Sequence, residues 1–311
     1  MQTKSESNKI DSFDTGEINL FELFQVLLAG KWTIIFVTTF ACVVVLIYSL
    51  ALPNIYESRV LLVPNDSNNQ SGLAKNYGSL ASIAGVSLPS NSNMSNSKKA
   101  IKKLTSLSFF ESNILPNIFL PDLVAIDSWN SELNFINYDN EIYDQSKNVW
   151  VLDKKLIPSA QESFYAFQSH VSFSDDNVNN FLTVKVKHQS PFIAKEWANL
   201  LIDQINDFYR QKDKKEAERA VDYLNTQIAR TKLSEIKEVI AELLQQETQK
   251  LTLIEANEYY VYEYIDPPAV MEKKSEPSRA FICILGALIG IIFGAVIVLL
   301  RNNTINKLIS S

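Results

Sequence analysis

Two long runs of residues without a formal charge constrain this chain more than any other feature. Trp32 to Leu52 and Ala280 to Leu300 each hold 21 residues with no Asp, Glu, Lys or Arg. At about 1.5 Å of rise per residue, each run forms a helix of about 31 Å, the thickness of a bilayer hydrocarbon core. Core helices of soluble proteins are seldom apolar on every face over this length. The sequence therefore predicts two transmembrane helices, 32–52 and 280–300.

The first run has a second interpretation, a cleavable signal peptide, because Ser49-Leu50-Ala51 resembles a cleavage site. The preceding segment, 1–31, is long and contains acidic residues such as Asp11 and Asp14, unlike the short basic start of a signal peptide. We therefore predict an uncleaved anchor. Two anchors place the tails 1–31 and 301–311 on one side of a membrane and residues 54–279 on the other. The charges beside the spans do not decide which side is which.

Composition and motifs exclude several classes of chemistry. The only cysteines, Cys42 and Cys283, lie in the apolar runs, so the domain between them has neither a disulfide nor a thiolate metal site. The formal net charge of −6 argues against a nucleic-acid partner. The only histidines, His170 and His188, are interpreted as structural or surface residues. No P-loop, nucleophile elbow or zincin motif occurs. The sequence predicts no catalytic, cofactor-binding or metal-binding residue.

The domain between the apolar runs shows both strand and helix patterns, so the predicted fold class is α+β. Strands are predicted at Tyr56–Val63 and Tyr259–Ile265, and a hairpin within 170–188, from β-forming residues and period-two alternation. The two strands nearest the spans run in opposite directions, so we expect antiparallel pairing. The segments 54–190 and 258–266 then form a membrane-proximal base with a mostly antiparallel sheet.

Two further segments of this base are less regular. Residues 65–97 are rich in Asn, Ser and Gly and are predicted to be a long loop. Short helices are predicted at Lys98–Leu107 and around Asn113–Leu120.

Residues 191–257 are predicted to be a long helical region. Ser190-Pro191 is an N-cap followed by proline at the first helical position, and neither Gly nor Pro occurs from 192 to 266. As one helix, residues 191–229 would measure about 58 Å, against a diameter of about 45 Å for a compact domain of this size. The helix is therefore predicted to protrude; an ordinary core helix is the alternative. The apolar phase slips between Ile228 and Leu233, which predicts a turn near 231–234. Its predicted packing face comprises Trp197, Leu201, Ile205, Phe208, Val221, Leu224 and Ile228.

The second apolar run carries glycine in steps of four, at Gly286, Gly290 and Gly294. Small residues on one face of a membrane helix allow close packing, here against the first span or against another protomer.

A connector, 266–279, precedes this run and contains Pro267, Pro268 and Pro277. Prolines restrict the backbone, so we predict that the orientation of the domain is transmitted to the span. A plain juxtamembrane linker is the alternative.

Taken together, this order of segments resembles the Wzz-type O-antigen chain-length determinants, the kinase-less polysaccharide co-polymerases of Gram-negative inner membranes. The resemblance rests most on IDPPAVMEKKSEPSR and the glycines after it, with support from GSLASIAGVSLP and from the long helical segment that begins YLNTQIARTKLSEIKEV. Pro268, Pro277 and Gly290 match the family's C-terminal pattern. The departures from that pattern are Met271, Glu276 and Ser278.

The resemblance implies cytoplasmic termini, a periplasmic domain 54–279 and a ring-like homo-oligomer. It implies a non-catalytic regulator of lipopolysaccharide O-antigen chain length, with no cofactor. The expected partners are the O-antigen polymerase and undecaprenyl-linked polysaccharide. The tails are too short for the tyrosine-kinase domain of some co-polymerases. Two alternatives stay open: a periplasmic adaptor or scaffold of a polysaccharide export system, and a membrane-bound enzyme acting on lipid-linked glycans.

Overall fold

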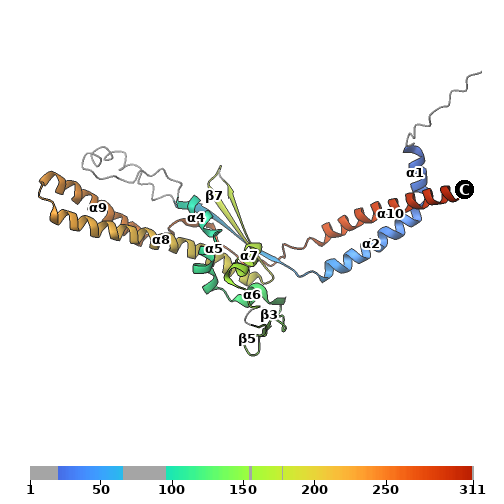
Figure 1. Cartoon of the computed structure of the whole chain (residues 1–311), viewed down its shortest axis with the longest axis horizontal. Helices are drawn as coiled ribbons and strands as arrows, with labels where there is room; N and C mark the ends of the chain where they lie inside the picture. The colour runs from blue at the N-terminus through green and yellow to red at the C-terminus, as the bar shows by residue number, and fades with distance from the viewer. Residues whose placement is uncertain (1–19, 66–95, 154–155, 177, 310–311) are drawn as a thin grey trace, which may run out of the picture. The chain divides into compact units, whose positions relative to one another are not determined.

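The computed structural model describes residues 20–65, 96–153, 156–176 and 178–309, and the chain separates into two compact units (Figure 1). One unit contains the chain up to Pro53 together with the chain from Pro277 onward, and the other is Asn54–Glu276. We refer to them as the helical unit and the mixed unit.

The helical unit consists of α1 (Leu20–Ala29), α2 (Lys31–Ala51) and α10 (Arg279–Ile309). Two stretches, Lys31–Ala51 and Arg279–Arg301, are long and apolar enough to cross a membrane. Only 6% of the apolar window of α2 and 22% of that of α10 is buried within the chain, so neither behaves as the core helix of a soluble protein. The length and the apolar composition of these two helices are typical of a membrane protein.

The mixed unit is built on a four-stranded antiparallel sheet in the order β6-β7-β1-β8. The strands are β1 (Tyr56–Pro64), β6 (Val171–Asp176), β7 (Phe181–His188) and β8 (Tyr262–Asp266). The predicted hairpin and the predicted antiparallel pairing of the first and last strands are confirmed. Side chains of β7 alternate between buried and half-buried, as a sheet covered on one face requires.

A helical hairpin rises from this sheet. α8 (Pro191–Arg230) has 40 residues and α9 (Ser234–Ala256) has 23. At the helical rise α8 is about 60 Å long. Its first half covers the inner face of the sheet, while its second half extends beyond the sheet alongside α9 (Figure 1). The protruding helix and the turn at 231–233 are therefore as predicted. The mixed helix and sheet composition confirms the α+β fold class.

One core joins the sheet, α8 and the segment after residue 96. That segment winds through α4 (Asn96–Leu104), α5 (Leu107–Phe109), a π-helix (Phe110–Ile114), a 3-10 turn (Leu115–Asn117) and α6 (Leu120–Val124). Phe109, Phe110 and Ile114 are buried in the core. The predicted helix Lys98–Leu107 ends early, because Ser106 accepts a hydrogen bond from the Phe109 backbone N–H and starts a new turn. The motif GSLASIAGVSLP lies outside the described residues.

Several elements were not predicted. They are α1, α7 (Ala160–His170), the hairpin of β2 (Ile126–Asn130) with β3 (Phe135–Tyr138), and the hairpin of β4 (Tyr143–Asp144) with β5 (Val149–Trp150). Both hairpins turn through an asparagine at positive φ, Asn134 and Asn148. Asparagine adopts positive φ more readily than most residues do, so these two asparagines were signals in the sequence from which the turns could have been predicted. Helix α7 begins at a capping box formed by Ser159 and Glu162, which is also a sequence signal.

Candidate functional site

The three stepped glycines of α10 pack against α2 of the same chain. A Cβ added to Gly290 would lie 2.9 Å from the backbone Cα of Thr38, and one added to Gly294 would lie 3.0 Å from the Cα of Ile34. A Cβ added to Gly286 would lie 2.7 Å from Cγ2 of Val45, so this third glycine contacts a side chain of α2. As the residue number rises on α10 it falls on α2, so the helices run antiparallel. The absence of side chains on α10 allows the two backbones to approach closely.

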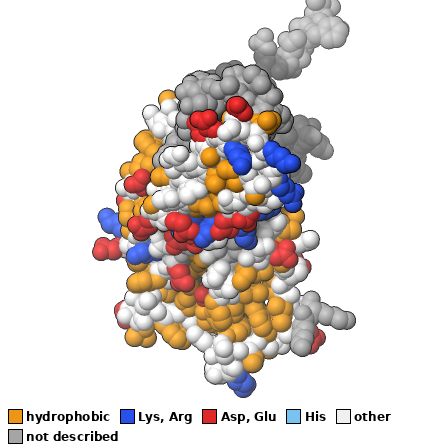
Figure 2. All heavy atoms as spheres, turned by 90° about the vertical axis from the view of Figure 1, so that its left-hand side faces the viewer, with side chains coloured by type: hydrophobic (Ala, Val, Ile, Leu, Met, Phe, Trp, Pro, Cys, Tyr) orange, Lys and Arg blue, Asp and Glu red, His pale blue; other side chains and the backbone are white. Residues whose placement is uncertain are grey.

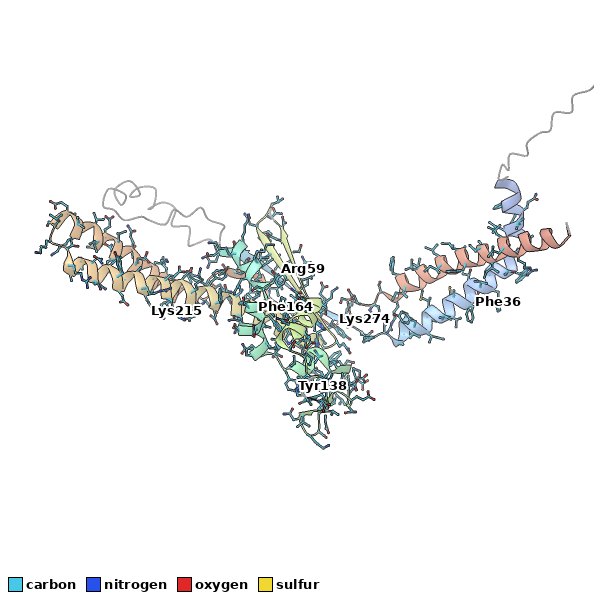
Figure 3. The ribbon with its side chains drawn as sticks, viewed as in Figure 1. Phe36, Arg59, Tyr138, Phe164, Lys215 and Lys274 are labelled. Atoms are coloured by element: carbon cyan, nitrogen blue, oxygen red, sulfur yellow. The ribbon has the colours of Figure 1, made fainter. Side chains whose placement is uncertain are left out.

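The proline-containing connector pairs with the start of β1. The Ile55 backbone N–H donates to the Glu276 carbonyl at 2.9 Å, and the Ser275 N–H donates to the Ile55 carbonyl at 2.8 Å. Ser58 Oγ donates to the Ala269 carbonyl at 3.0 Å. Lys274, which is labelled in Figure 3, donates from Nζ to Asn54 Oδ1 at 3.0 Å. The two ends of the mixed unit, which continue into α2 and α10, therefore meet at one backbone bridge.

The prolines of this connector have different surroundings. Pro268 is buried, Pro277 is half-buried and Pro267 is exposed. Glu276, a departure from the family pattern, pairs with Lys187 at 2.5 Å on the exposed face. An exposed ion pair of this kind contributes at most about 1 kcal/mol. Order in the connector therefore comes mainly from its backbone pairing and from the buried Pro268.

The predicted packing face of the long helix contacts two different partners. Trp197, Leu201 and Ile205 are fully buried in the core beneath the sheet. Phe208 is half-buried, edge-on to Phe109 with ring centroids 5.9 Å apart. The remaining three residues, Val221, Leu224 and Ile228, are half-buried in the part of α8 that lies beyond the sheet with α9.

Charged residues of α8 lie between its buried first half and the part that extends beyond the sheet. Lys214 of α8 pairs with Glu255 of α9, and Tyr260 donates to Asp213 at 2.7 Å. Seen from the hairpin end, acidic and basic side chains are interspersed, without a large area of a single sign (Figure 2). This surface suits a helical hairpin that stands in water.

Asn206, which we did not predict, joins α8 to β8. Its side chain is 4% exposed. Oδ1 accepts hydrogen bonds from the backbone N–H groups of Val261 at 2.7 Å and Tyr262 at 3.0 Å, and Nδ2 donates to the Tyr262 carbonyl at 3.1 Å. The amide thus satisfies three backbone groups at the start of β8. No sequence signal distinguishes it from a solvent-facing asparagine beside Ile205.

The two histidines lie in a buried aromatic cluster around Trp197. The ring centroid of His188 is 4.9 Å from that of Trp197, and that of His170 is 5.7 Å from it. Nδ1 of His188 accepts from the Ser190 N–H at 2.9 Å, so Nε2 carries the proton and donates to the Asp122 carbonyl at 3.0 Å. The neutral ring satisfies both partners. Burial lowers the pKa of His188 to about 4 and also lowers the pKa of His170.

This cluster predicts a loss of stability in acid. The folded-state pKa of His188 lies below the ordinary value of 6.5, so the unfolded chain binds the proton more readily. The stabilising contribution of the neutral ring is complete above pH 6.5 and is lost as the pH falls toward 4. The loss reaches about 3 kcal/mol. Unfolding curves across this range, for the native chain and for His188→Gln, measure it.

Glutamine can keep both hydrogen bonds but does not titrate, so His188→Gln should have the flatter pH dependence. Equal slopes for the two proteins would contradict the assignment. Carboxyl groups also titrate in this range, but they do so in both proteins, and the difference in slope reports the histidine.

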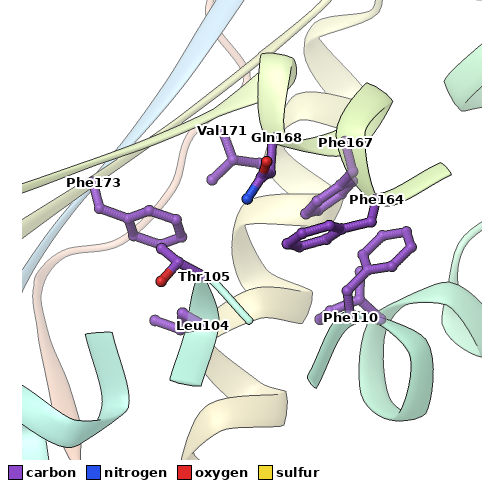
Figure 4. A pocket seen from close by; sticks show the side chains of 9 residues that line it. Leu104, Thr105, Phe110, Phe164, Phe167, Gln168, Val171 and Phe173 are labelled. Carbon is purple, nitrogen blue, oxygen red and sulfur yellow. The ribbon is translucent and has the colours of Figure 1, made fainter. Parts of the chain in front are cut away.

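An apolar pocket lies beside this core, between α4, the π-helix, α7 and β6 (Figure 4). Its volume is about 290 Å³. The rings of Phe110, Phe164, Phe167 and Phe173 line it, and its polar side chains are Thr105 and Gln168. Among the described residues, no cluster of three His, Cys, Asp or Glu side chains is arranged to hold a metal ion.

We compared the chain with models of known protein families. Residues 16–114 match the family model described as chain length determinant protein, Wzz. This part of the chain is a Wzz chain length determinant domain. The resemblance to Wzz-type determinants inferred from the sequence is thereby confirmed. The matched span includes α1, α2 and β1, covers less than half of the chain, and ends before the connector and the stepped glycines.

Two solved structures are similar to this chain at low identity. One is described as a full-length bacterial polysaccharide co-polymerase; it has 17% identity, a TM-score of 0.44, and coverage of 93% of this chain and 99% of its own. The other is a fragment of WzzB, a polysaccharide co-polymerase from Salmonella Typhimurium; it has 13% identity, a TM-score of 0.29, and coverage of 72% and 100%. Similarity at these scores does not bear on function. None of the curated proteins compared with the chain matches it.

Proposed function

We propose that this Wzz-type chain regulates the length of lipid-linked O-antigen polysaccharide without catalysing bond formation. In this proposal residues 32–52 and 280–300 cross the inner membrane of a Gram-negative bacterium. The tails 1–31 and 301–311 are cytoplasmic, and residues 54–279 lie in the periplasm. Copies of the chain form a ring-like homo-oligomer that acts with the O-antigen polymerase.

The observation that carries the proposal is the match of residues 16–114 to the chain length determinant family. The structure adds compatible features. The two apolar helices pack as an antiparallel pair through Gly286, Gly290 and Gly294. A helical hairpin extends from the sheet and offers a long surface for copies of the chain to meet along.

Deletion of the gene tests the proposal. The lipopolysaccharide of the deletion strain, separated on a gel, should lose its preferred cluster of O-antigen lengths while polymer is still made. A plasmid copy should restore the cluster. A regulator that works in an assembly with a polymerase should also change the length distribution when its expression is raised relative to that polymerase.

An unchanged ladder after deletion would reject the proposal. Loss of all polymer would instead favour an enzyme or an essential export component, the two alternatives left open by the sequence.

A further inference from the structure

Helix α1 is an apolar segment that the neighbouring membrane span cannot include. Its sequence, LFELFQVLLA, has one acid and one amide among ten residues. α2 alone has 21 residues and measures about 31 Å, which already equals the hydrocarbon thickness of a bilayer. A continuous helix from residue 20 to residue 51 would measure about 48 Å. α1 therefore needs a location outside the hydrocarbon core.

The chain changes direction at Gly30, between the two helices. Gly30 has φ −88° and ψ 9°, outside the helical range. A side chain there would overlap Val298 of α10. The apolar stretch of α10 ends just beyond Val298, at Leu300, and Arg301 follows. Gly30 is therefore level with the end of the apolar part of α10.

The start of α2 marks the same level. Lys31 is its first residue, and Trp32 is 75% exposed. Tryptophan and basic residues are typical of the boundary between membrane and water. Figure 1 shows α1 turned away from the axis of α2, and α1 contacts both α2 and α10.

α1 carries apolar side chains on two sides. Val26 and Leu27 are half-buried where the helix packs on α2 and α10. Phe24 and Leu28, one turn apart, are 59% and 52% exposed. The next exposed large apolar side chain along the sequence is Trp32, at the start of α2.

We propose that α1 lies in the plane of the membrane surface on the side of the termini, with Phe24 and Leu28 inserted into the lipid. A helix that lies in the membrane surface buries its lipid-facing apolar side chains about 5–10 Å into the boundary between headgroups and acyl chains. The proposal rests on the membrane placement of α2 and α10 given under the proposed function. A lipid surface fits better than a protein partner, because the exposed side chains lie at the level where the apolar bands of both spans end.

Spin labels can test this, because the chain has only two cysteines. In a Cys42→Ala, Cys283→Ala background, single cysteines replace Phe24, Leu28 or Gln25, and each is labelled with a nitroxide in full-length protein in phosphatidylcholine nanodiscs. Two reference positions are Val43, exposed in the middle of α2, and Leu133, 77% exposed in the mixed unit. The measured quantities are collision rates with oxygen, which enters lipid, and with a nickel chelate, which stays in water.

Labels at positions 24 and 28 should show a ratio of oxygen to nickel collisions several-fold above that at position 25. Their depth should be about 5–10 Å below the phosphates. The ratio at position 43 should be higher still, and that at 133 the lowest.

Three results would overturn the inference while leaving the spans in place. Nickel collisions at 24 and 28 equal to those at 133 would put α1 in water. Low collision rates with both reagents would show that another protein surface covers the helix. A depth equal to that of position 43 would place α1 inside the core. Nickel access at position 43 itself would reject the membrane placement, and with it the proposed function.

Discussion

Replacing Gly290 by leucine should separate α2 from α10 and abolish the preferred glycan length. A Cβ at this position would lie 2.9 Å from the Cα of Thr38, so the collision involves backbone and no rotamer change can relieve it. The two helices should move apart toward the 8–10 Å between axes that is usual for helices separated by side chains. Overpacking of this kind costs about 1–3 kcal/mol. If the assembly depends on this pair, the lengths should spread into an unmodulated ladder.

Distance measurements between spin labels at Val44 and Ile289, both exposed, report the separation directly, and the glycan ladder reports its consequence. Ala280→Leu is the matched control, because it adds similar bulk at an exposed position of α10 and should change neither result. A wider helix pair with an unaltered length cluster would show that the glycine contact is incidental to function. An unchanged separation would show that the contact is not as close as described.

Replacing Asn206 by leucine should destabilise the mixed unit by about 3 kcal/mol, because buried backbone groups that lose their partners cost about 1–3 kcal/mol each. The substitution leaves the N–H groups of Val261 and Tyr262 and the carbonyl of Tyr262 without the amide that now satisfies them. Exchange of those two amide hydrogens with solvent should accelerate more than about a hundredfold. Hydrogen exchange followed by mass spectrometry measures this.

Asn225→Leu is the matched control, since it makes the same substitution at an exposed position of the same helix. It should leave exchange in β8 unchanged. Equal exchange rates in Asn206→Leu and the native chain would mean that the start of β8 is held by other contacts.

The features that could be predicted from the sequence are those that depend on one repeating pattern. Composition alone located the two apolar helices. Alternation in Phe181–His188 identified a strand, and the absence of Gly and Pro identified the long helix. The slip in apolar phase near residue 231 located its turn. Each of these signals is local and extends over many residues, so tertiary contacts do not override it.

The features that could not be predicted depend on pairs of residues far apart in the chain. Nothing near Asn206 indicates that its amide meets residues 55 and 56 positions later. The glycine steps predicted a packing face, but only the structure identified α2 as the surface in contact. α1 was missed for a different reason: it directly precedes an apolar span, and its own apolar residues were interpreted as part of a tail.

The bridge between Ile55 and the connector has a consequence for synthesis. Ser275 and Ile55 are 220 residues apart, and β1, a central strand, is made long before β7 and β8, the strands that flank it. Contacts of such long sequence separation slow folding, because a large loop must close before any of them forms. While the ribosome is still translating, β1 therefore has unpaired edges on both sides. Completion of the sheet must wait until nearly the whole chain has emerged, and unpaired strand edges are prone to aggregation during that interval.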